Sequence, residues 1–104
     1  MQNYNLKFKS DLKERCYRFS LAIIALADTL PNNKRSVWII IDQLMRSAMS
    51  IGANLIEARA SSSRLEFKKF YEIALKSANE TKYWLGLLRD AKMANRERID
   101  KLLQ

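Results

Sequence analysis

The stretch LMRSAMSIGANLIEARASSSRLEF, residues 44–67, contains the end of one amphipathic segment, a serine-rich turn and the start of another. Ser61, Ser62 and Ser63 interrupt the helical pattern. Ser63 and Glu66 have the spacing of a capping box, in which each side chain satisfies a backbone amide at a helix start. Small residues before the turn would let a neighbouring backbone approach closely: Ser47, Ala48, Ser50, Gly52 and Ala53. The stretch therefore predicts a helix hairpin.

Apolar residues continue outward from the hairpin at alternating spacings of four and three, which is typical of bundle helices. The seams are Leu12, Cys16, Phe19, Ile23, Leu26 and Leu30; Val37, Ile41, Leu44, Ala48, Ile51 and Leu55; and Phe67, Tyr71, Ala74, Ala78, Thr81, Leu85 and Leu88. Pro31 ends the first segment, and Asn95 can cap a short last one with apolar Ile99, Leu102 and Leu103. The helices are predicted at residues 7–30, 34–60, 64–93 and 96–103. Because the connections are short, the prediction is a single all-α domain over residues 1–104: an up-down-up-down four-helix bundle with a short or truncated fourth helix.

A second apolar stripe accompanies the seam on the two central helices, and two stripes need two partners. Those partners are either neighbours within the chain or another subunit. The short fourth helix also leaves apolar surface uncovered, which favours association. The predicted homo-oligomer interface is Trp38, Met45, Met49, Ile56, Phe70, Ile73 and Trp84.

The composition is that of a small folded protein, with 48% hydrophobic and 29% charged residues among 104. The longest apolar runs are far shorter than the roughly 20 residues that span a bilayer. The N-terminal MQNYNLKFKS lacks an apolar signal core, so the chain is expected in the cytoplasm, with no membrane partner.

Enzymatic chemistry has little support in the sequence. There is no histidine, which removes the commonest general base and metal ligand near neutral pH. Cys16 lies on an apolar seam, which favours a buried structural thiol over a nucleophile. No phosphate-binding glycine loop or metal-ligand spacing is present. We therefore expect no catalytic residues, no cofactor and no metal.

The charge favours a polyanionic partner. There are 19 Lys and Arg against 11 Asp and Glu, a net charge of +8. In the predicted topology the start of the first helix, the end of the second and the start of the third meet at one end, where two helix N-termini add partial positive charge. The predicted nucleic-acid-binding residues there are Lys7, Lys9, Lys13, Arg15, Arg18, Arg59, Arg64, Lys68 and Lys69. The alternative is a solvated charged rim.

Asn54, Glu57 and Glu80 are polar residues near predicted packed faces. They could form a functional polar site, or they could hydrogen-bond one another or a helix end and so determine helix register. The second interpretation is favoured, since register is the best-attested use of buried polar groups.

Two segments carry a family resemblance: RSAMSIGANLIE, residues 46–57, and EFKKFYEIALKSANETKYWL, residues 66–85. They resemble the bacterial four-helix-bundle family of proteins encoded in intervening sequences of large-subunit ribosomal RNA genes, which is related to the accessory variability determinant of diversity-generating retroelements. The chain departs from the family at Ala58, Arg59 and Ala60, where glycine is usual, and in its short fourth helix. The resemblance implies a homopentameric bundle, nucleic-acid binding and no known catalysis.

Two functions are compatible with these observations. The first is a non-catalytic homo-oligomeric module that holds RNA or DNA by its backbone at the basic end. The alternative is a protein-interaction scaffold or accessory subunit, for example for a reverse transcriptase.

Overall fold

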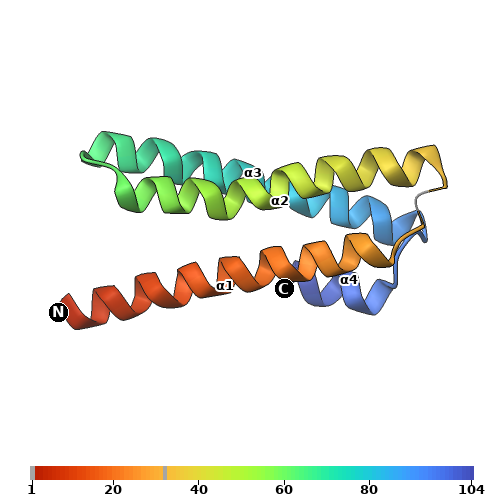
Figure 1. Cartoon of the computed structure of the whole chain (residues 1–104), viewed down its shortest axis with the longest axis horizontal. Coiled ribbons are helices and arrows are strands. Elements are labelled where there is room, and N and C mark those ends of the chain that lie inside the picture. Colours follow the sequence, from red (N-terminus) through yellow and green to blue (C-terminus); the bar gives the residue numbers. More distant parts are fainter. Residues whose placement is uncertain (1, 32) are drawn as a thin grey trace.

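The chain forms four helices in the computed structural model, which describes residues 2–31 and 33–104 and the side chains of residues 11–31 and 33–104. The helices are α1 (Gln2–Thr29), α2 (Arg35–Ala60), α3 (Arg64–Asp90) and α4 (Arg96–Leu103). Each helix runs antiparallel to the one before it (Figure 1), because connections of a few residues leave no room for a crossover. The predicted all-α bundle with a short fourth helix is confirmed.

The bundle has two layers. α2 and α3 form one layer and make the most extensive helix contact, while α1 packs on α2 and α4 packs on α3 (Figure 1). The molecule measures 48 × 23 × 18 Å. α4 runs beside only the C-terminal half of α1, so the other half of the bundle contains three helices.

The first two helices differ slightly from the predicted bounds. α1 begins at Gln2 instead of residue 7, since residues 2–10 contain neither proline nor glycine to prevent helix formation. It ends at Thr29, two residues before Pro31. α2 begins at Arg35 because Lys34 is the N-cap and has an extended backbone.

The third helix ends at Asp90, three residues earlier than predicted. Lys92 adopts a left-handed conformation with φ of 59°. The amide of Met93 donates to the carbonyl of Leu88 at 2.9 Å, and the amide of Lys92 donates to the carbonyl of Arg89 at 3.1 Å. These two bonds form a Schellman motif, which terminates the helix and satisfies its last carbonyl groups.

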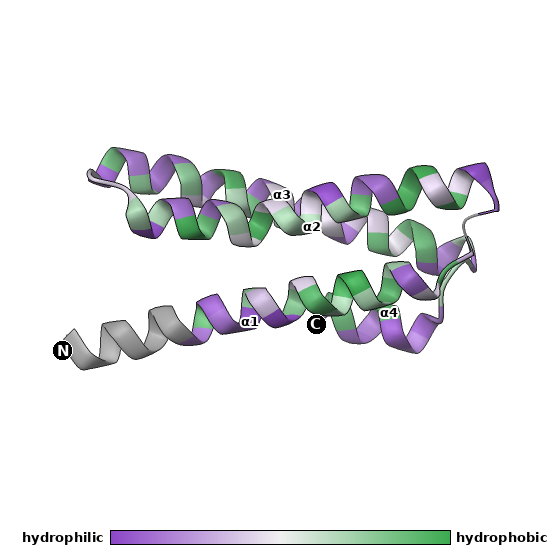
Figure 2. Ribbon diagram, in the orientation of Figure 1, coloured by the Kyte–Doolittle hydropathy of each residue, from purple (hydrophilic) through white to green (hydrophobic). Residues whose placement is uncertain are grey.

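The fully buried core lies in the half of the bundle that contains α4. It draws on all four helices, with Ile23, Leu26, Leu44, Ala48, Leu85, Leu88 and Ile99 each at most 1% exposed. The most hydrophobic part of α1 lies in this half, beside α4 (Figure 2). At the other end the predicted seam is not fully buried: Phe67 and Tyr71 are 41% and 40% exposed, because α4 is too short to cover them.

Small polar side chains line the contact between α2 and α3. The hydroxyl oxygens of Ser47 and Thr81 lie 2.9 Å apart, as do those of Ser50 and Ser77. The hydroxyl of Thr81 also lies 2.7 Å from the carbonyl oxygen of Ser77. No buried side-chain polar atom in the described part of the chain lacks a hydrogen-bond partner, so hydrogen bonds offset the desolvation of the hydroxyl groups in this close contact.

The second stripe of α2 has its partner largely within the chain. Met45 and Met49 pack against the core. A Cβ atom at Gly52 would lie 4.0 Å from side-chain atoms of Cys16 and Ser20 on α1. The sequence left open whether this stripe packs against a neighbour within the chain or against another subunit. Along its middle the partner is α1 of the same chain.

Candidate nucleic-acid interface

Three helix ends lie together at one end of the molecule: the start of α1, the end of α2 and the start of α3 (Figure 1). Seven of the nine cations predicted for this basic end have described side chains, and all seven are exposed: Lys13, Arg15, Arg18, Arg59, Arg64, Lys68 and Lys69. Lys7 and Lys9 lie outside the residues whose side chains are described. The topology thus gathers cations that are far apart in the sequence.

Few of these cations are neutralised by ion pairs. Arg18 pairs with Glu14 at 2.9 Å, and the Lys68 ammonium lies 4.0 Å from the Glu72 carboxylate. Each is an exposed pair of i and i+4 residues on one helix, and such pairs are worth only about 0 to 1 kcal/mol. The other five cations form no ion pair with any described residue. The basic end can therefore exchange its weak internal partners for an external anion.

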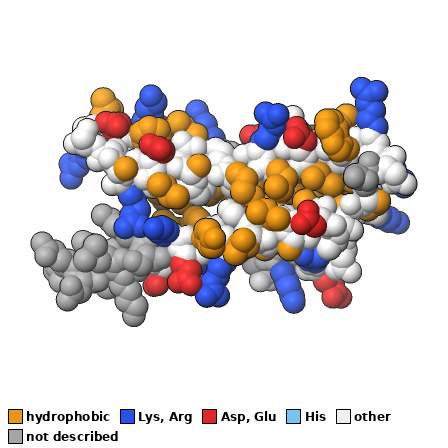
Figure 3. Space-filling view, viewed as in Figure 1, with side chains coloured by type: hydrophobic (Ala, Val, Ile, Leu, Met, Phe, Trp, Pro, Cys, Tyr) orange, Lys and Arg blue, Asp and Glu red, His pale blue; other side chains and the backbone are white. Residues whose placement is uncertain are grey.

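An apolar groove of about 630 Å³ runs beside the basic end, between α1 and the α2–α3 pair. Its lining includes Cys16 and Leu21 from α1, Gly52 and Ile56 from α2, and Phe67 from α3. Figure 3 shows apolar side chains in this hollow and cationic side chains at its edge. Among the residues whose side chains are described, Lys13 and Arg59 are the charged ones that line it, so the fold brings together a cation from α1 and one from α2.

The N-terminus of α3 is partly occupied by its own caps. The Ser63 hydroxyl accepts a hydrogen bond from the Glu66 amide at 3.1 Å, which is half of the predicted capping box. The other half differs: the Glu66 carboxylate accepts from the Ser62 hydroxyl at 3.2 Å. The Glu66 carboxylate lies in the first turn of α3 and therefore offsets part of the partial positive charge at this helix N-terminus. That positive charge is the feature by which the sequence suggested a phosphate contact here.

The three predicted structural polar residues are not brought together. The half-buried Asn54 amide donates to the Ser50 carbonyl at 2.8 Å and contacts the Ser50 hydroxyl at 2.9 Å. Glu57 is exposed. Glu80 is also exposed and accepts from the Trp84 indole at 3.2 Å, so it is not a buried charge. Only Asn54 lies beside the polar contact between α2 and α3.

The predicted oligomer-interface residues separate into three groups. Met45, Met49 and Trp84 pack against the core of their own chain, and Phe70 is half-buried. Ile56 lines the groove with Met49. Trp38 and Ile73 are exposed and do not line the groove.

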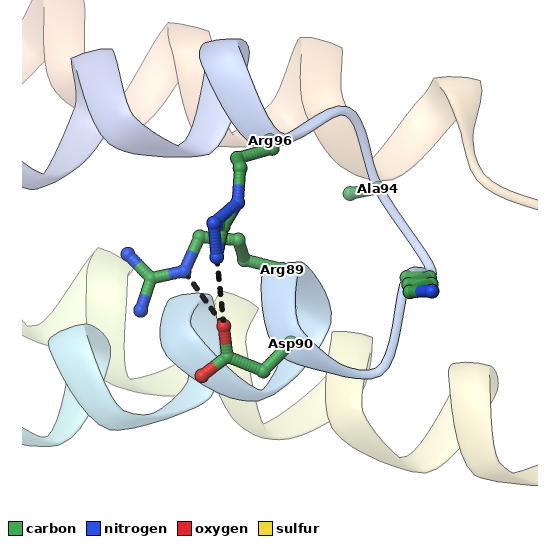
Figure 4. Close-up of a pocket in the computed structure, with 5 residues that line it drawn as sticks. Arg89, Asp90, Ala94 and Arg96 are labelled. Atoms are coloured by element: carbon green, nitrogen blue, oxygen red, sulfur yellow. Dashed lines mark hydrogen bonds and ion pairs between the residues drawn. The ribbon is translucent and has the colours of Figure 1, made fainter.

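An ion-pair cluster at the opposite end was not anticipated from the sequence. Arg89 donates to Asp90 at 2.9 Å, and Arg96 lies 3.7 Å from Asp90 (Figure 4). Arg89 also donates to Asp100 of α4 at 3.0 Å. The hydrogen bonds that Arg89 donates to Asp90 and Asp100 raise the pKa of Arg89, and the bond that Asp90 accepts from Arg89 lowers the pKa of Asp90. The Arg89–Asp100 pair joins α3 to α4 across eleven residues, a spacing that no single-helix pattern reveals.

The same end contains a shallow pocket of about 340 Å³ lined by Arg89, Asp90, Lys92, Ala94 and Arg96. Two of its three cations are already paired with Asp90. These two cations of the pocket are therefore less available to an external anion than the unpaired cations of the basic end.

Cys16 is half-buried on α1. Burial raises the pKa of the Cys16 thiol, and the charge of the nearby Arg15 opposes this effect only in part. Because the net shift of the pKa is upward, the thiolate fraction is low. No group of three potential metal ligands occurs in the described part of the chain. None of the described helices is long and apolar enough to cross a membrane.

Comparison with known proteins gives one family. The sequence model of the family described as 23S rRNA-intervening sequence protein matches residues 9–104. A search of curated proteins found no match. The chain is similar to a crystal structure from Bacteroides thetaiotaomicron, that of a protein with unknown function from the S23 ribosomal protein family, with 36% identity and a TM-score of 0.83. The similarity covers 90% of this chain and 83% of that one.

Proposed function

Because the chain belongs to the 23S rRNA-intervening sequence protein family, we propose that it is a non-catalytic helical-bundle protein that binds ribosomal RNA by the phosphate backbone. The observation that carries this proposal is the gathering of six exposed cations toward the end where α1 starts, α2 ends and α3 starts, with Arg18 nearer the middle of α1. Backbone contacts supply most of the affinity in sequence-independent binding. The proposal places the protein in the cytoplasm, where ribosomal RNA is made.

The contact would be electrostatic and have little base specificity. The described residues form no β-sheet on which aromatic side chains could stack against RNA bases. The basic residues lie instead on exposed helix surfaces. Arg64 and Lys69 have no described ion-pair partner, and Lys68 has only the distant Glu72. These three cations are the natural place to test the interface.

The experiment compares two triple variants that remove the same charge. Arg64, Lys68 and Lys69 are changed to Gln at the basic end, and Lys34, Arg35 and Lys92 are changed to Gln at the opposite end. All six residues are exposed, and the three control residues form no ion pair with a described residue. Arg89 and Arg96 are avoided in the control because they hold the cluster around Asp90.

Affinity for a mixed-sequence RNA is measured by fluorescence anisotropy at low salt, with DNA of the same sequence for comparison. The basic-end variant should bind more weakly than the control variant. Equal losses would mean that the charge acts diffusely and that no local interface exists. A wild-type protein that binds neither nucleic acid would contradict the proposal as a whole.

We also propose self-association through exposed apolar residues that do not belong to the core. Trp38, at 60% exposure, is the most exposed of the predicted interface residues. A pentamer is the assembly that the family resemblance implies. Light scattering tests this: a mass of 12.2 kDa at micromolar concentration would exclude it. Trp38→Glu should shift an oligomer toward that mass.

An accessory role beside another protein, such as a reverse transcriptase, is the second candidate function. The observation that favours a protein partner is the apolar groove, which a polar RNA backbone would not fill.

A further inference from the structure

The turn between α3 and α4 holds a pocket at the opposite end of the molecule from the basic end (Figure 1). Its volume of about 340 Å³ is at the low end of the roughly 300 to 1,000 Å³ of small-molecule sites. We call it the turn pocket, and its lining is Arg89, Asp90, Lys92, Ala94 and Arg96. Because α4 runs from this turn toward the middle of the molecule, the pocket does not depend on how far α4 extends.

The charge of the turn pocket is positive. Its lining holds three cations against the single carboxylate of Asp90, an excess of two positive charges. Asp100 lies outside the lining but accepts a hydrogen bond from Arg89 at 3.0 Å, which lowers the local excess to one. The pocket therefore attracts an anion, and attracts a dianion more strongly than a monoanion.

The turn pocket also has more hydrogen-bond donors than acceptors. Arg89 uses its Nε atom for Asp90 and its Nη1 atom for Asp100, which leaves its Nη2 group without a described partner. Arg96 approaches the same Oδ1 atom of Asp90 (Figure 4). Its Nη2 atom is 3.7 Å away, longer than the roughly 2.7 to 3.2 Å of a hydrogen bond. One carboxylate thus occupies only part of what the two guanidinium groups can donate.

Lys92 supplies the third cation at a position that is unfavourable for lysine. Its backbone is left-handed, with φ of 59°, and glycine is the usual residue at this point of a Schellman motif. The Lys92 ammonium forms no ion pair with a described residue. A strained residue that brings an unpaired cation into a pocket is a sign of a binding role.

The three cations come from the end of α3, the turn and the start of α4. A phosphate monoester carries close to two negative charges and has three terminal oxygens, so each cation can contact a different oxygen. Arginine pairs with phosphate through parallel N–H groups, which suits the unused donors here. We propose that the turn pocket binds a dianionic phosphate group, carried by a free phosphate ester or by the end of an RNA chain.

The experiment titrates ¹⁵N-labelled protein with phosphate and with phenyl phosphate at pH 8, where both are mainly dianions. Ionic strength is held constant, and acetate serves as the monoanionic control. The backbone amides of Met93 and Ala94, in the turn, report the location through their NMR shifts. We expect saturable shifts of these amides with phosphate and phenyl phosphate, and much weaker binding of acetate.

Variants of two lining residues should change the affinity in opposite directions. Lys92→Gln removes a cation and should weaken phenyl phosphate binding by about tenfold or more, the value of a charge-assisted contact. Lys92→Gly should lose the same affinity and yet melt higher, since it relieves the left-handed strain. Asp90→Asn removes the carboxylate that competes for the arginines and should tighten binding, a gain that partial unfolding cannot produce.

Matched controls make the same charge changes away from the turn pocket. Lys76→Gln and Glu57→Gln alter exposed residues that do not line it and form no ion pair with a described residue. Both should leave the affinity unchanged. If they shift it as much as the lining variants do, net charge explains the binding and the pocket does not.

Two RNAs of one sequence distinguish the sources of the phosphate group. One carries a 5′-phosphate and the other a 5′-hydroxyl, which leaves only monoanionic phosphodiesters. Shifts of the Met93 and Ala94 amides with phenyl phosphate assign a free ester, and shifts only with the 5′-phosphorylated RNA assign the end of an RNA chain. Because the readout is local to the turn, failure of RNA binding at the basic end leaves the phenyl phosphate result intact.

Three results would overturn the proposal. In the first, neither phosphate, phenyl phosphate nor 5′-phosphorylated RNA shifts the turn amides saturably. In the second, acetate binds as tightly as phenyl phosphate. In the third, Lys92→Gln binds as the wild type does, or Asp90→Asn fails to bind more tightly.

Discussion

The hydroxyl oxygens of Ser47 on α2 and Thr81 on α3 lie 2.9 Å apart in the buried contact between the two helices. Ser47 is 4% exposed and Thr81 is 2% exposed. The Thr81 hydroxyl also lies 2.7 Å from the Ser77 carbonyl oxygen, and the Ser47 hydroxyl donates to the Leu44 carbonyl at 3.2 Å. Small side chains permit close approach here, and their hydroxyl groups satisfy one another instead of being desolvated without a partner.

Thr81→Val should lower the free energy of unfolding by about 1 kcal/mol, because it preserves the side-chain shape but removes a buried hydrogen bond. The urea midpoint measures this. Ser36→Ala is the control, since Ser36 is exposed near the start of α2. Equal midpoints for the two variants would show that the contact depends on shape alone.

Ala48→Leu should destabilise the protein by about 1 to 3 kcal/mol, because three added carbon atoms would overpack a closely packed core. Ala48 is 0% exposed and lies in the core cluster. Arg46→Ala, two residues away, removes only an exposed pair with Asp42 and should stay within about 0.5 kcal/mol. Thermal unfolding of both variants tests this, and similar melting temperatures would contradict close packing at Ala48.

Lys92→Gly should stabilise the protein by about 1 kcal/mol. A left-handed backbone conformation is unfavourable by about that free energy for a residue with a Cβ atom, and glycine adopts it at almost no cost. Lys92 is the non-glycine residue with positive φ that ends α3. Lys82→Gly, at an exposed position inside α3, should instead destabilise by about 1 kcal/mol. Chemical denaturation should therefore give opposite signs, and the same sign for both would contradict the Schellman motif.

The link between α3 and α4 should weaken in acid. Arg89 holds the pKa of Asp90 below its usual value. A carboxyl group whose pKa is lower in the folded chain stabilises the fold above its unfolded pKa of about 3.9, and this contribution is lost as pH falls through the folded pKa. Asp90→Asn should therefore melt below the wild type at neutral pH, and the difference should shrink as the pH falls below about 4.

Asp28→Asn is the control for this pH dependence, because Asp28 is exposed and forms no ion pair with a described residue. A melting difference for Asp90→Asn that is the same at acid and neutral pH would indicate that the carboxylate charge is not involved.

RNA binding should weaken steeply with salt. If Arg64, Lys68 and Lys69 each contact a phosphate, changing them to Gln should reduce the slope of log affinity against log salt by roughly 2 to 3, at about 0.7 to 0.9 per contact. Titrations at several salt concentrations measure the slope. An unchanged slope would mean that these three residues do not contact phosphate.

The local patterns predicted most of the helix limits and two of the caps. Ser63 accepts from the Glu66 amide, and Asn95 accepts from the Arg98 amide at 3.0 Å, because caps involve residues three positions apart. The early end of α3 escaped prediction because lysine, not glycine, occupies the left-handed position. The Arg89–Asp100 pair escaped because its members belong to different helices.

The charge distribution was predictable to the level of one end of the bundle. Chain direction and short connections bring the start of α1, the end of α2 and the start of α3 together. The apolar seam was predicted correctly where four helices meet, at Leu44 and Leu85, but its outer members Phe67 and Tyr71 are partly exposed. Periodicity identifies the face of a helix that is apolar, and it does not say whether another helix covers that face.

The sequence by itself determined four antiparallel helices, their approximate limits and a basic end, because periodicity, capping and loop length act between residues close in the chain. Only the tertiary structure decided that Lys13 and Arg59, 46 positions apart, line one groove and that Cys16 lies within it. These relationships depend on where α1 lies against α2. That placement is set by packing of the whole bundle, which no local pattern encodes.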